Sequence, residues 1–280
     1  MAERRPTEAA LERSDALDEM DPHEILELIH AEDAVAHAAV GEVLPRMAEA
    51  VEVLACALSG GGRWFNVGAG TSGRIGVLDA SEIPPTYGLP PRVVQGIMAG
   101  GDSALRNAIE GAEDDLHAGS LELEERGVTL GDVVIGLSAS GTTPYVLGAI
   151  EVANKLGART IAITCDPGSP LAESVEISIA PQVGPEVVTG STRMKGGLAQ
   201  KMILTALSTA VMVRMGRVRG HHMTHISPGS SKLRGRAVRI VMELGRVDRE
   251  RARDLLRTTE GSVEAALQIL ETERAANARG

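Results

Sequence analysis

Five short apolar runs, separated by stretches of helical length and by glycine-rich turns, limit the folds that this chain can adopt. The runs cover residues 63–68, 92–100, 132–140, 159–166 and 175–181. None alternates strictly between apolar and polar side chains, which is typical of strands that are covered on both faces. The sequence therefore predicts a doubly wound α/β fold, in which helices flank a mainly parallel five-stranded sheet.

The segment before the first run predicts a helix. Asp21 and Glu24 have the spacing of a capping box, and Pro22 suits the first helical turn. These residues predict a helical segment over 21–58, which Pro45 kinks or divides.

Helical patterns also occur between the later runs and after them. Residues 143–157 and 192–216 have helical length and spacing, with Thr143 as the expected cap of the first. After Gly220 we expect no further strand, and residues 231–280 predict two or three short helices. The expected organisation is an N-terminal helical segment over residues 1–50, a central domain that contains the sheet over 51–220, and a C-terminal helical appendage over 221–280.

The composition argues against several classes of protein. A formal net charge of −10 and only four aromatic residues disfavour nucleic-acid binding, which uses clustered basic side chains and stacking rings. No apolar stretch approaches the roughly 20 uninterrupted residues of a membrane helix. Cys56 and Cys165 are too few for a disulfide framework, and the first residues lack the apolar core of a signal peptide. We therefore expect a cytoplasmic protein with no membrane or nucleic-acid partner.

Two turns rich in glycine and hydroxyl side chains follow the first and third runs. Residues 68–74 read Gly-Ala-Gly-Thr-Ser-Gly-Arg, and residues 138–144 read Ser-Ala-Ser-Gly-Thr-Thr-Pro. Open α/β sheets bind ligands at the carboxyl ends of their strands, and hydroxyls beside helix N-termini suit a phosphate group. The expected ligand is a sugar phosphate, although in either turn alone the hydroxyls could simply cap a helix. The expected contacts are Gly70, Thr71, Ser72, Gly73, Ser138, Ser140, Gly141, Thr142 and Thr143.

Nucleotide motifs fit the first turn poorly. Gly68, Gly70 and Gly73 have the spacing of a dinucleotide fingerprint, but no acidic residue ends the second strand about 20 residues later. The Gly-Lys-Ser/Thr triplet of nucleoside triphosphate sites is also missing from the sequence. We therefore expect no nucleotide cofactor.

Two acidic segments contain candidate acid and base groups. Glu82 lies shortly before a rigid Pro-Pro step, where a surface charge has no evident structural task. Glu113 lies in the run 110–115, which is also typical of a solvated helix face. Two carboxylates beside a sugar phosphate can abstract a proton next to a carbonyl and protonate a leaving group. Within the run, pattern alone does not separate Glu113 from Glu110, Asp114 and Asp115.

Basic and hydroxyl side chains also come together at the start of the long apolar helix. The candidates for contact with an anion are Ser191, Thr192, Arg193 and Lys195. An alternative is that Ser191 only caps the helix.

Three histidines, His221, His222 and His225, lie close together in the sequence. Spacings of three and four residues would put two of them on one helix face, as in zinc sites. No cysteine or carboxylate nearby in the sequence completes a ligand set, so we expect no metal site.

At these motifs, from about Met20 to Lys232, the chain resembles the N-acetylmuramic acid 6-phosphate etherases of the sugar-isomerase (SIS) domain superfamily. The matching stretches include EILELIHAED, GAGTSGRIGVLDASEIPPTYG, AIEGAEDD, SASGTTPYV and VGPEVVTGSTRMKGGLAQKMIL. The resemblance implies a SIS-like sheet and a homodimer with active sites near the subunit interface. It implies no metal and no organic cofactor.

The implied reaction cleaves the D-lactyl ether at C3 of the sugar and yields N-acetylglucosamine 6-phosphate and D-lactate. By motif, Glu82 resembles the acid that protonates the departing lactate, and Glu113 the second catalytic carboxylate, the candidate base at C2. The chain has Thr142 where the family usually has arginine, and Gly-His-His-Met-Thr-His over 220–225 where the family usually reads Gly-Asn-Leu-Met-Val-Asp. A sugar-phosphate isomerase and a non-catalytic sugar-phosphate sensor are the alternatives, and the presence of both glutamates weighs against the sensor.

Overall fold

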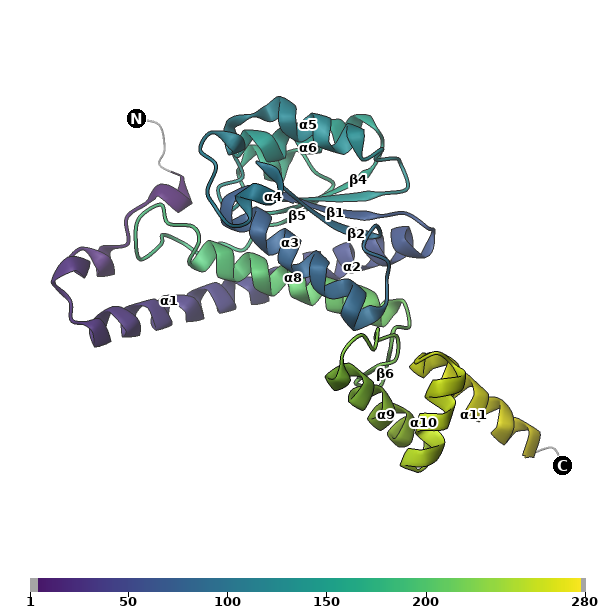
Figure 1. Ribbon diagram of the computed structural model, residues 1–280. Coiled ribbons are helices and arrows are strands. Elements are labelled where there is room, and N and C mark those ends of the chain that lie inside the picture. Colours follow the sequence, from purple (N-terminus) through teal and green to yellow (C-terminus); the bar gives the residue numbers. More distant parts are fainter. Residues whose placement is uncertain (1–4, 278–280) are drawn as a thin grey trace. The chain divides into compact units, whose positions relative to one another are not determined.

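The computed structural model describes residues 5–277, which form two compact units (Figure 1). The first, here called the sheet unit, contains the described residues up to Ser81 together with Arg92–Val211. The second, the helical unit, contains Glu82–Pro91 and the described residues from Met212 onward. This division differs from the expected one, because the N-terminal helices belong to the same unit as the sheet.

A parallel sheet forms the centre of the sheet unit. Its strands are β1 (Trp64–Gly68), β2 (Val94–Met98), β3 (Val133–Leu137), β4 (Arg159–Ile163) and β5 (Ile177–Ile179), in the order β2-β1-β3-β4-β5. All neighbouring pairs are parallel. Every residue of β1 and β3 is buried, which explains why these runs lack an alternating pattern. The predicted doubly wound fold is confirmed.

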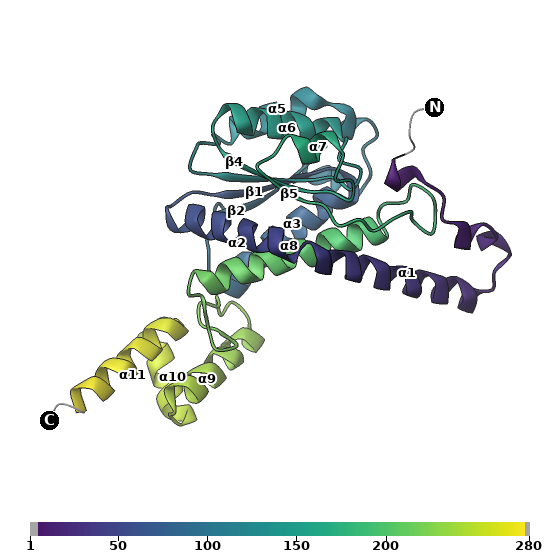
Figure 2. The same ribbon diagram turned by 180° about the vertical axis from the view of Figure 1, so that it is seen from behind.

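Helices cover both faces of this sheet. Figures 1 and 2 show α5 (Leu116–Glu125) and α6 (Pro144–Lys155) over one face, and α2 (Leu44–Ser59), α3 (Gly70–Tyr87) and α8 (Lys195–Arg214) over the other. The remaining elements of this unit are short: 3-10 turns η1 (Pro6–Glu8), η2 (Glu12–Ser14), η3 (Leu17–Glu19) and η4 (Ala112–Asp114), and helices α4 (Gly101–Ala104) and α7 (Pro170–Glu173).

The N-terminal helix begins at the predicted capping box. Asp21 Oδ1 accepts hydrogen bonds from the backbone N–H groups of His23 and Glu24, and Glu24 Oε2 accepts one from the N–H of Asp21. Helix α1 (Pro22–Glu42) ends at Val43, and Pro45 lies in the first turn of α2. The prediction that Pro45 divides the helical segment is confirmed.

Helix α8 is the one described helix whose length and apolar composition would suffice to cross a membrane. In the structure, 56% of the most apolar 18-residue stretch of this helix is buried inside the protein. Ile203, Leu204, Leu207 and Val211 are completely buried, which is typical of the core helix of a globular unit.

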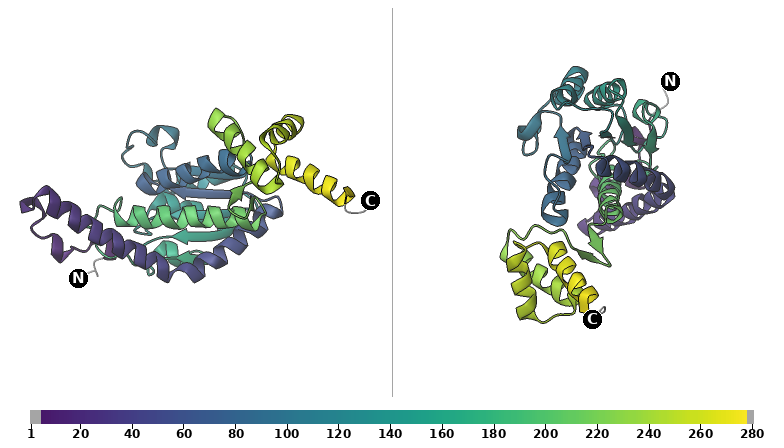
Figure 3. Two further views of the ribbon diagram at one scale, coloured as in Figure 1. Left: turned by 90° about the horizontal axis from the view of Figure 1, so that it is seen from below. Right: turned by 90° about the vertical axis from the view of Figure 1, so that its right-hand side faces the viewer.

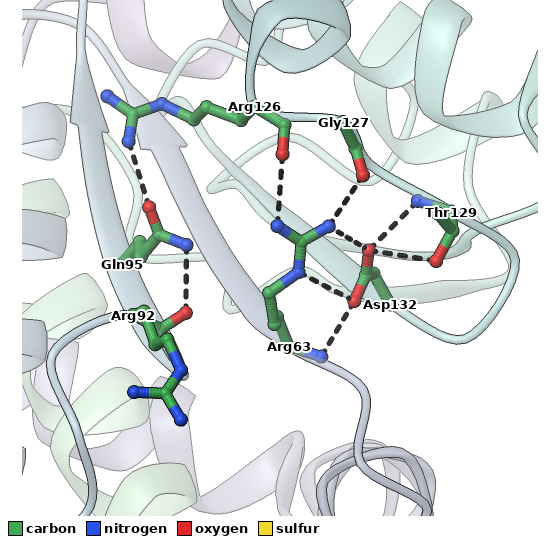
Figure 4. A network of polar contacts seen from close by, with 7 residues as sticks. All are labelled: Arg63, Arg92, Gln95, Arg126, Gly127, Thr129 and Asp132. Atoms are coloured by element: carbon green, nitrogen blue, oxygen red, sulfur yellow. Dashed lines mark hydrogen bonds and ion pairs between the residues drawn. The ribbon is translucent and has the colours of Figure 1, made fainter.

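An ion pair and hydrogen bonds join the amino ends of β1 and β3, at the edge opposite to the glycine turns (Figure 4). Asp132, 2% exposed, accepts hydrogen bonds from the backbone N–H of Arg63 at 2.7 Å, from the Arg63 guanidinium at 2.7 Å and from the N–H of Thr129 at 2.9 Å. Burial raises the pKa of the Asp132 carboxyl, but these hydrogen bonds and the Arg63 charge outweigh it, so the net pKa is lowered.

Asp132→Asn is expected to lower the free energy of unfolding at pH 7 by about 2 kcal/mol, because hydrogen bonds to a buried charge are lost. A lowered pKa stabilises the fold above the pKa of the unfolded chain and loses that effect as the pH falls. The variant should therefore show a smaller loss of stability below about pH 4 than the wild type. Urea unfolding followed by circular dichroism at several pH values tests this. Glu151→Gln, which removes an exposed ion pair with Lys155, serves as the control and should have little effect.

The helical unit contains α9 (Ser231–Gly245), α10 (Arg249–Thr258) and α11 (Val263–Asn277), shown in green and yellow in Figure 3. They enclose a small core that includes Ile240, Val241, Leu255 and Leu267. The predicted C-terminal helices are confirmed. The expectation of no strand after Gly220 is wrong, since β6 (Val218–Arg219) and β7 (His222–Met223) form an antiparallel hairpin.

Candidate active site

The turn between β1 and α3 depends on two close-packed glycines. A Cβ on Gly68 would lie 2.6 Å from the backbone nitrogen of Gly73, so the strand end and the first helical turn touch without room for a side chain. This contact presents Thr71 and Ser72 at the N-terminus of α3. Gly73, one of the expected ligand contacts, is buried in this packing.

The turn after β3 is held by bonds between its own hydroxyls. Ser138 Oγ lies 2.8 Å from Thr143 Oγ1, and Ser140 Oγ lies 3.0 Å from Thr142 Oγ1. Thr143 is the N-cap residue of α6, as predicted, but its side chain makes no capping hydrogen bond. Gly141 is also buried in this turn. A Cβ on Gly141 would lie 2.0 Å from Ser169 Oγ, so the turn has no room for a side chain at this position.

Both turns line one cavity of about 470 Å³ in the sheet unit. Carboxylates from η1 and η4 and one hydroxyl from the loop before α8 complete its wall. Of the expected ligand contacts, the lining includes Gly70, Thr71, Ser72, Ser138, Ser140, Thr142, Thr143 and Thr192. This arrangement offers an anion many hydroxyls and the N-termini of two helices.

Glu113 lies where this cavity meets a second one of about 240 Å³. The residues common to both linings are Ala69, Gly70 and Glu113, so Glu113 is their one shared carboxylate. The other acidic residues of the run 110–115 do not line both cavities. Glu110 lines only the smaller cavity and Asp114 only the larger one, whereas Asp115 caps α5 by accepting from the N–H of Ala118.

The wall of the smaller cavity is fixed by Arg74. Its guanidinium donates to the carbonyl oxygens of Ala104 at 2.7 Å and Leu105 at 3.1 Å, at the end of α4. These bonds connect the first turns of α3 to the loop that precedes η4. Arg74 therefore fixes the end of α4 on the wall of the smaller cavity, which Glu113 also lines.

Glu82 has a different location. It is exposed, belongs to the segment Glu82–Pro91 of the helical unit, and lines neither of the two cavities. It follows Gly70 by twelve residues on α3, which corresponds to about 18 Å along a helix.

Lys195 does not face the cavity. Its side chain is 2% exposed, and Nζ lies 2.5 Å from Oε2 of Glu32, which is itself buried on α1. Arg13 also contacts this carboxylate, with Nη1 at 3.2 Å from Oε1. The sequence indicated a basic residue at this helix start but not that its charge is neutralised within the protein. Ser191 and Arg193 also do not line the cavity.

A second buried carboxylate holds the same helix end. Glu186 accepts hydrogen bonds at 2.9 Å from the backbone N–H groups of Lys195 and Gly196. Burial raises the pKa of Glu186, although these bonds and the Lys195 charge oppose the shift. The loop containing Thr192 is thus fixed at the first turn of α8.

Sequence reasoning missed Glu8. This residue of η1 lines the larger cavity, and its Oε2 lies 3.3 Å from the position of a Cβ on Gly190, whose φ is +76°. The neighbouring Thr7 is buried and anchors the turn. A carboxylate repels phosphate but accepts hydrogen bonds from sugar hydroxyls, so Glu8 suits the sugar end of a ligand. No pattern in its surroundings distinguishes it from other N-terminal acidic residues.

Comparison with protein families and solved structures identifies the fold. Residues 116–210 match the SIS domain family, and residues 46–154 match the glucokinase regulatory protein N-terminal SIS domain family. A phosphoheptose isomerase from Neisseria gonorrhoeae covers 68% of this chain and 98% of its own, with a TM-score of 0.52 and 19% identity. A phosphoheptose isomerase from Francisella tularensis covers 69% of this chain and 98% of its own, with a TM-score of 0.52 and 19% identity. These structures share the SIS fold.

Similarity to curated proteins is much stronger. N-acetylmuramic acid 6-phosphate etherase of Jannaschia sp. (strain CCS1) is 48% identical over 93% of this chain and 83% of its own length. The protein of that name from Cronobacter sakazakii is 48% identical over 94% of this chain and 90% of its own length. The one from Symbiobacterium thermophilum is 47% identical over 94% of this chain and 88% of its own length. With such identity over nearly its whole length, the chain belongs to the N-acetylmuramic acid 6-phosphate etherase family.

Proposed function

We propose that the protein is a carbon–oxygen lyase that cleaves the D-lactyl ether of N-acetylmuramic acid 6-phosphate. The products are N-acetylglucosamine 6-phosphate and D-lactate. Family membership supports this function, and the observation that carries it is Glu113, placed between a cavity lined by two hydroxyl-rich turns and a smaller adjoining one.

The phosphate group binds at the two turns. Hydroxyls of Thr71, Ser72 and Ser140 and the backbone N–H groups at the starts of α3 and α6 surround it, and the helix dipoles favour its negative charge. The sugar then extends toward Glu113. Glu8, on the wall of the same cavity, accepts a hydrogen bond from a sugar hydroxyl.

The reaction is an elimination followed by addition of water. The open-chain aldehyde at C1 acidifies the proton on C2, and Glu113 removes it. The electron pair is first held as an enolate over C2, C1 and the C1 oxygen. It then forms a double bond between C2 and C3 as the bond from C3 to the lactyl oxygen breaks. Glu82 gives a proton to the departing lactate oxygen, and water then adds at C3 as a proton returns to C2. Each carboxylate thereby acts at one of the two carbon atoms.

A homodimer accounts for the position of Glu82. This carboxylate belongs to the helical unit and Glu113 to the sheet unit, whereas the reaction requires both at one substrate. We propose that Glu82 reaches the Glu113 site of the partner subunit, which makes the active site composite. We also expect the enzyme to act in the cytoplasm, in the catabolism of amino sugars from recycled peptidoglycan.

The deciding assay measures D-lactate release from N-acetylmuramic acid 6-phosphate, with chelator present and with chelator absent. Release by the wild type supports the lyase. Conversion of the sugar phosphate between aldose and ketose without lactate would indicate an isomerase. Binding of the sugar phosphate with neither reaction would indicate a sensor.

Ser140→Ala is expected to raise KM about tenfold or more with little change in kcat, since contacts to a remote phosphate are similar in the ground and transition states. Steady-state rates over a range of substrate concentrations measure both constants. Ser174→Ala, which removes a hydroxyl at the end of α7, is the control. An unchanged KM, together with unchanged affinity for the substrate, would show that phosphate binds elsewhere.

A further inference from the structure

Two histidines and a glutamate cluster in the helical unit, on elements that the proposed reaction does not use. His221 lies in the turn of the β6–β7 hairpin after Gly220, and His222 begins β7. Glu243 lies on α9, together with Arg236 and the other residues of one helix face. The hairpin and this face enclose a cavity of about 270 Å³, lined by His221, His222, Met223, Arg236, Arg239, Ile240 and Glu243.

From this arrangement we propose that His221, His222 and Glu243 bind a divalent transition-metal ion of the zinc class. One donor atom of each residue lies within 4.8 Å of the others. His222 Nε2 lies 3.4 Å from Glu243 Oε1, close to the spacing of about 3.4 Å between two ligand atoms in a tetrahedral zinc site. The site is thus nearly formed before metal binds.

The remaining adjustment is small and falls on mobile side chains. The Glu243 side chain is 61% exposed and His221 is also exposed, so both can rotate, whereas the His222 side chain is only 15% exposed and is held by the hairpin. The two imidazole rings lie 4.1 Å apart, tilted by 39°. Two imidazoles and one carboxylate leave a fourth position for water, as in three-ligand zinc sites.

The charges around the cavity select the class of ion. Arg236 and Arg239 line the same cavity, and their positive charges oppose a cation that is held mainly by electrostatic attraction. Mg²⁺ and Ca²⁺ bind in that way through several oxygen ligands, which this cluster does not supply. Imidazole nitrogen forms stronger bonds with Zn²⁺, Ni²⁺ and Cu²⁺. The third nearby histidine, His225, takes no part, because its ring lies beside Thr224 in a different cavity.

Zinc binding to the full, tag-free chain, freed of metal with chelator, tests the proposal by equilibrium dialysis. We expect one Zn²⁺ per chain, and a visible absorption band when Co²⁺ takes its place. His222→Ala and Glu243→Gln should each weaken zinc binding at least about 100-fold, since even outer-shell changes cost 10 to 100-fold. Arg239→Gln should tighten it, because a repelling charge is removed.

A second histidine–glutamate pair provides the matched control. His23 Nδ1 lies 3.5 Å from Glu27 Oε2 on α1, and both side chains are exposed, but no third ligand of the described residues 5–277 lies within 4.8 Å of both. His23→Ala should leave zinc affinity unchanged. Equal affinity of the wild type and the His222→Ala protein, or displacement of Zn²⁺ by an equal concentration of Mg²⁺, would overturn the proposal. A zinc dissociation constant above about 1 mM would do the same.

Discussion

The Glu113→Gln protein is expected to release D-lactate at least about 100-fold more slowly than the wild type, the usual scale for loss of one general base. It should also lose exchange of the C2 proton with solvent, because proton removal from C2 is the first step. Substrate affinity should change little, since the phosphate is bound by the hydroxyl turns. Lactate assays and deuterium incorporation at C2, followed by NMR, measure the two steps separately.

Glu110→Gln is the most informative comparison for this experiment. Glu110 belongs to the same acidic run and lines only the smaller cavity, whereas Glu113 lines both. We expect the Glu113 substitution to reduce activity far more. The reverse order would mean that the base is misassigned, and a wild-type rate in both variants would contradict the lyase mechanism.

The Glu82→Gln protein should separate the two halves of the reaction. Because Glu82 acts on the departing oxygen, lactate release should fall by about 100-fold or more, while deuterium from solvent still enters C2. Loss of both activities together would indicate that Glu82 shapes the site instead of protonating the leaving group.

Mixing the two inactive variants tests whether Glu82 serves the partner subunit. In a mixed dimer, one of the two composite sites then contains both intact glutamates. Random reassociation makes half of the dimers mixed, so about a quarter of the wild-type activity should return. Glu82→Gln protein unfolded and refolded alone is the control and should stay inactive. No recovery, although mixed dimers form, would place Glu82 in the site of its own chain.

The sheet could be predicted because its signal is local. Each strand is a short apolar run, and in β1 and β3 burial on both faces removes the alternation that exposed strands show. The capping box at Asp21 is local too, since its partners lie two and three residues away. Such features need no knowledge of the rest of the chain.

The features that the sequence did not reveal depend on distant partners. Thr143 has the position of a cap, yet its hydroxyl is bonded to Ser138, and only the folded turn brings those atoms together. Likewise, Glu243 follows His222 by twenty-one residues, and only the fold brings its carboxylate within 3.4 Å of the imidazole. Glu8 reaches the cavity from the N-terminal segment, without any pattern that marks it.

The buried pair of Glu32 and Lys195 restricts how relatives of this protein can diverge. A lineage that replaces Glu32 alone keeps the unpaired Lys195 charge in the interior, at a cost of about 3 to 5 kcal/mol, a large part of the usual stability of a domain. One that replaces Lys195 alone leaves the buried Glu32 with only Arg13, whose side chain is 61% exposed. Replacing both by apolar side chains of similar volume avoids that cost. The two positions, 163 apart in the sequence, therefore change together or pass through an unstable ancestor.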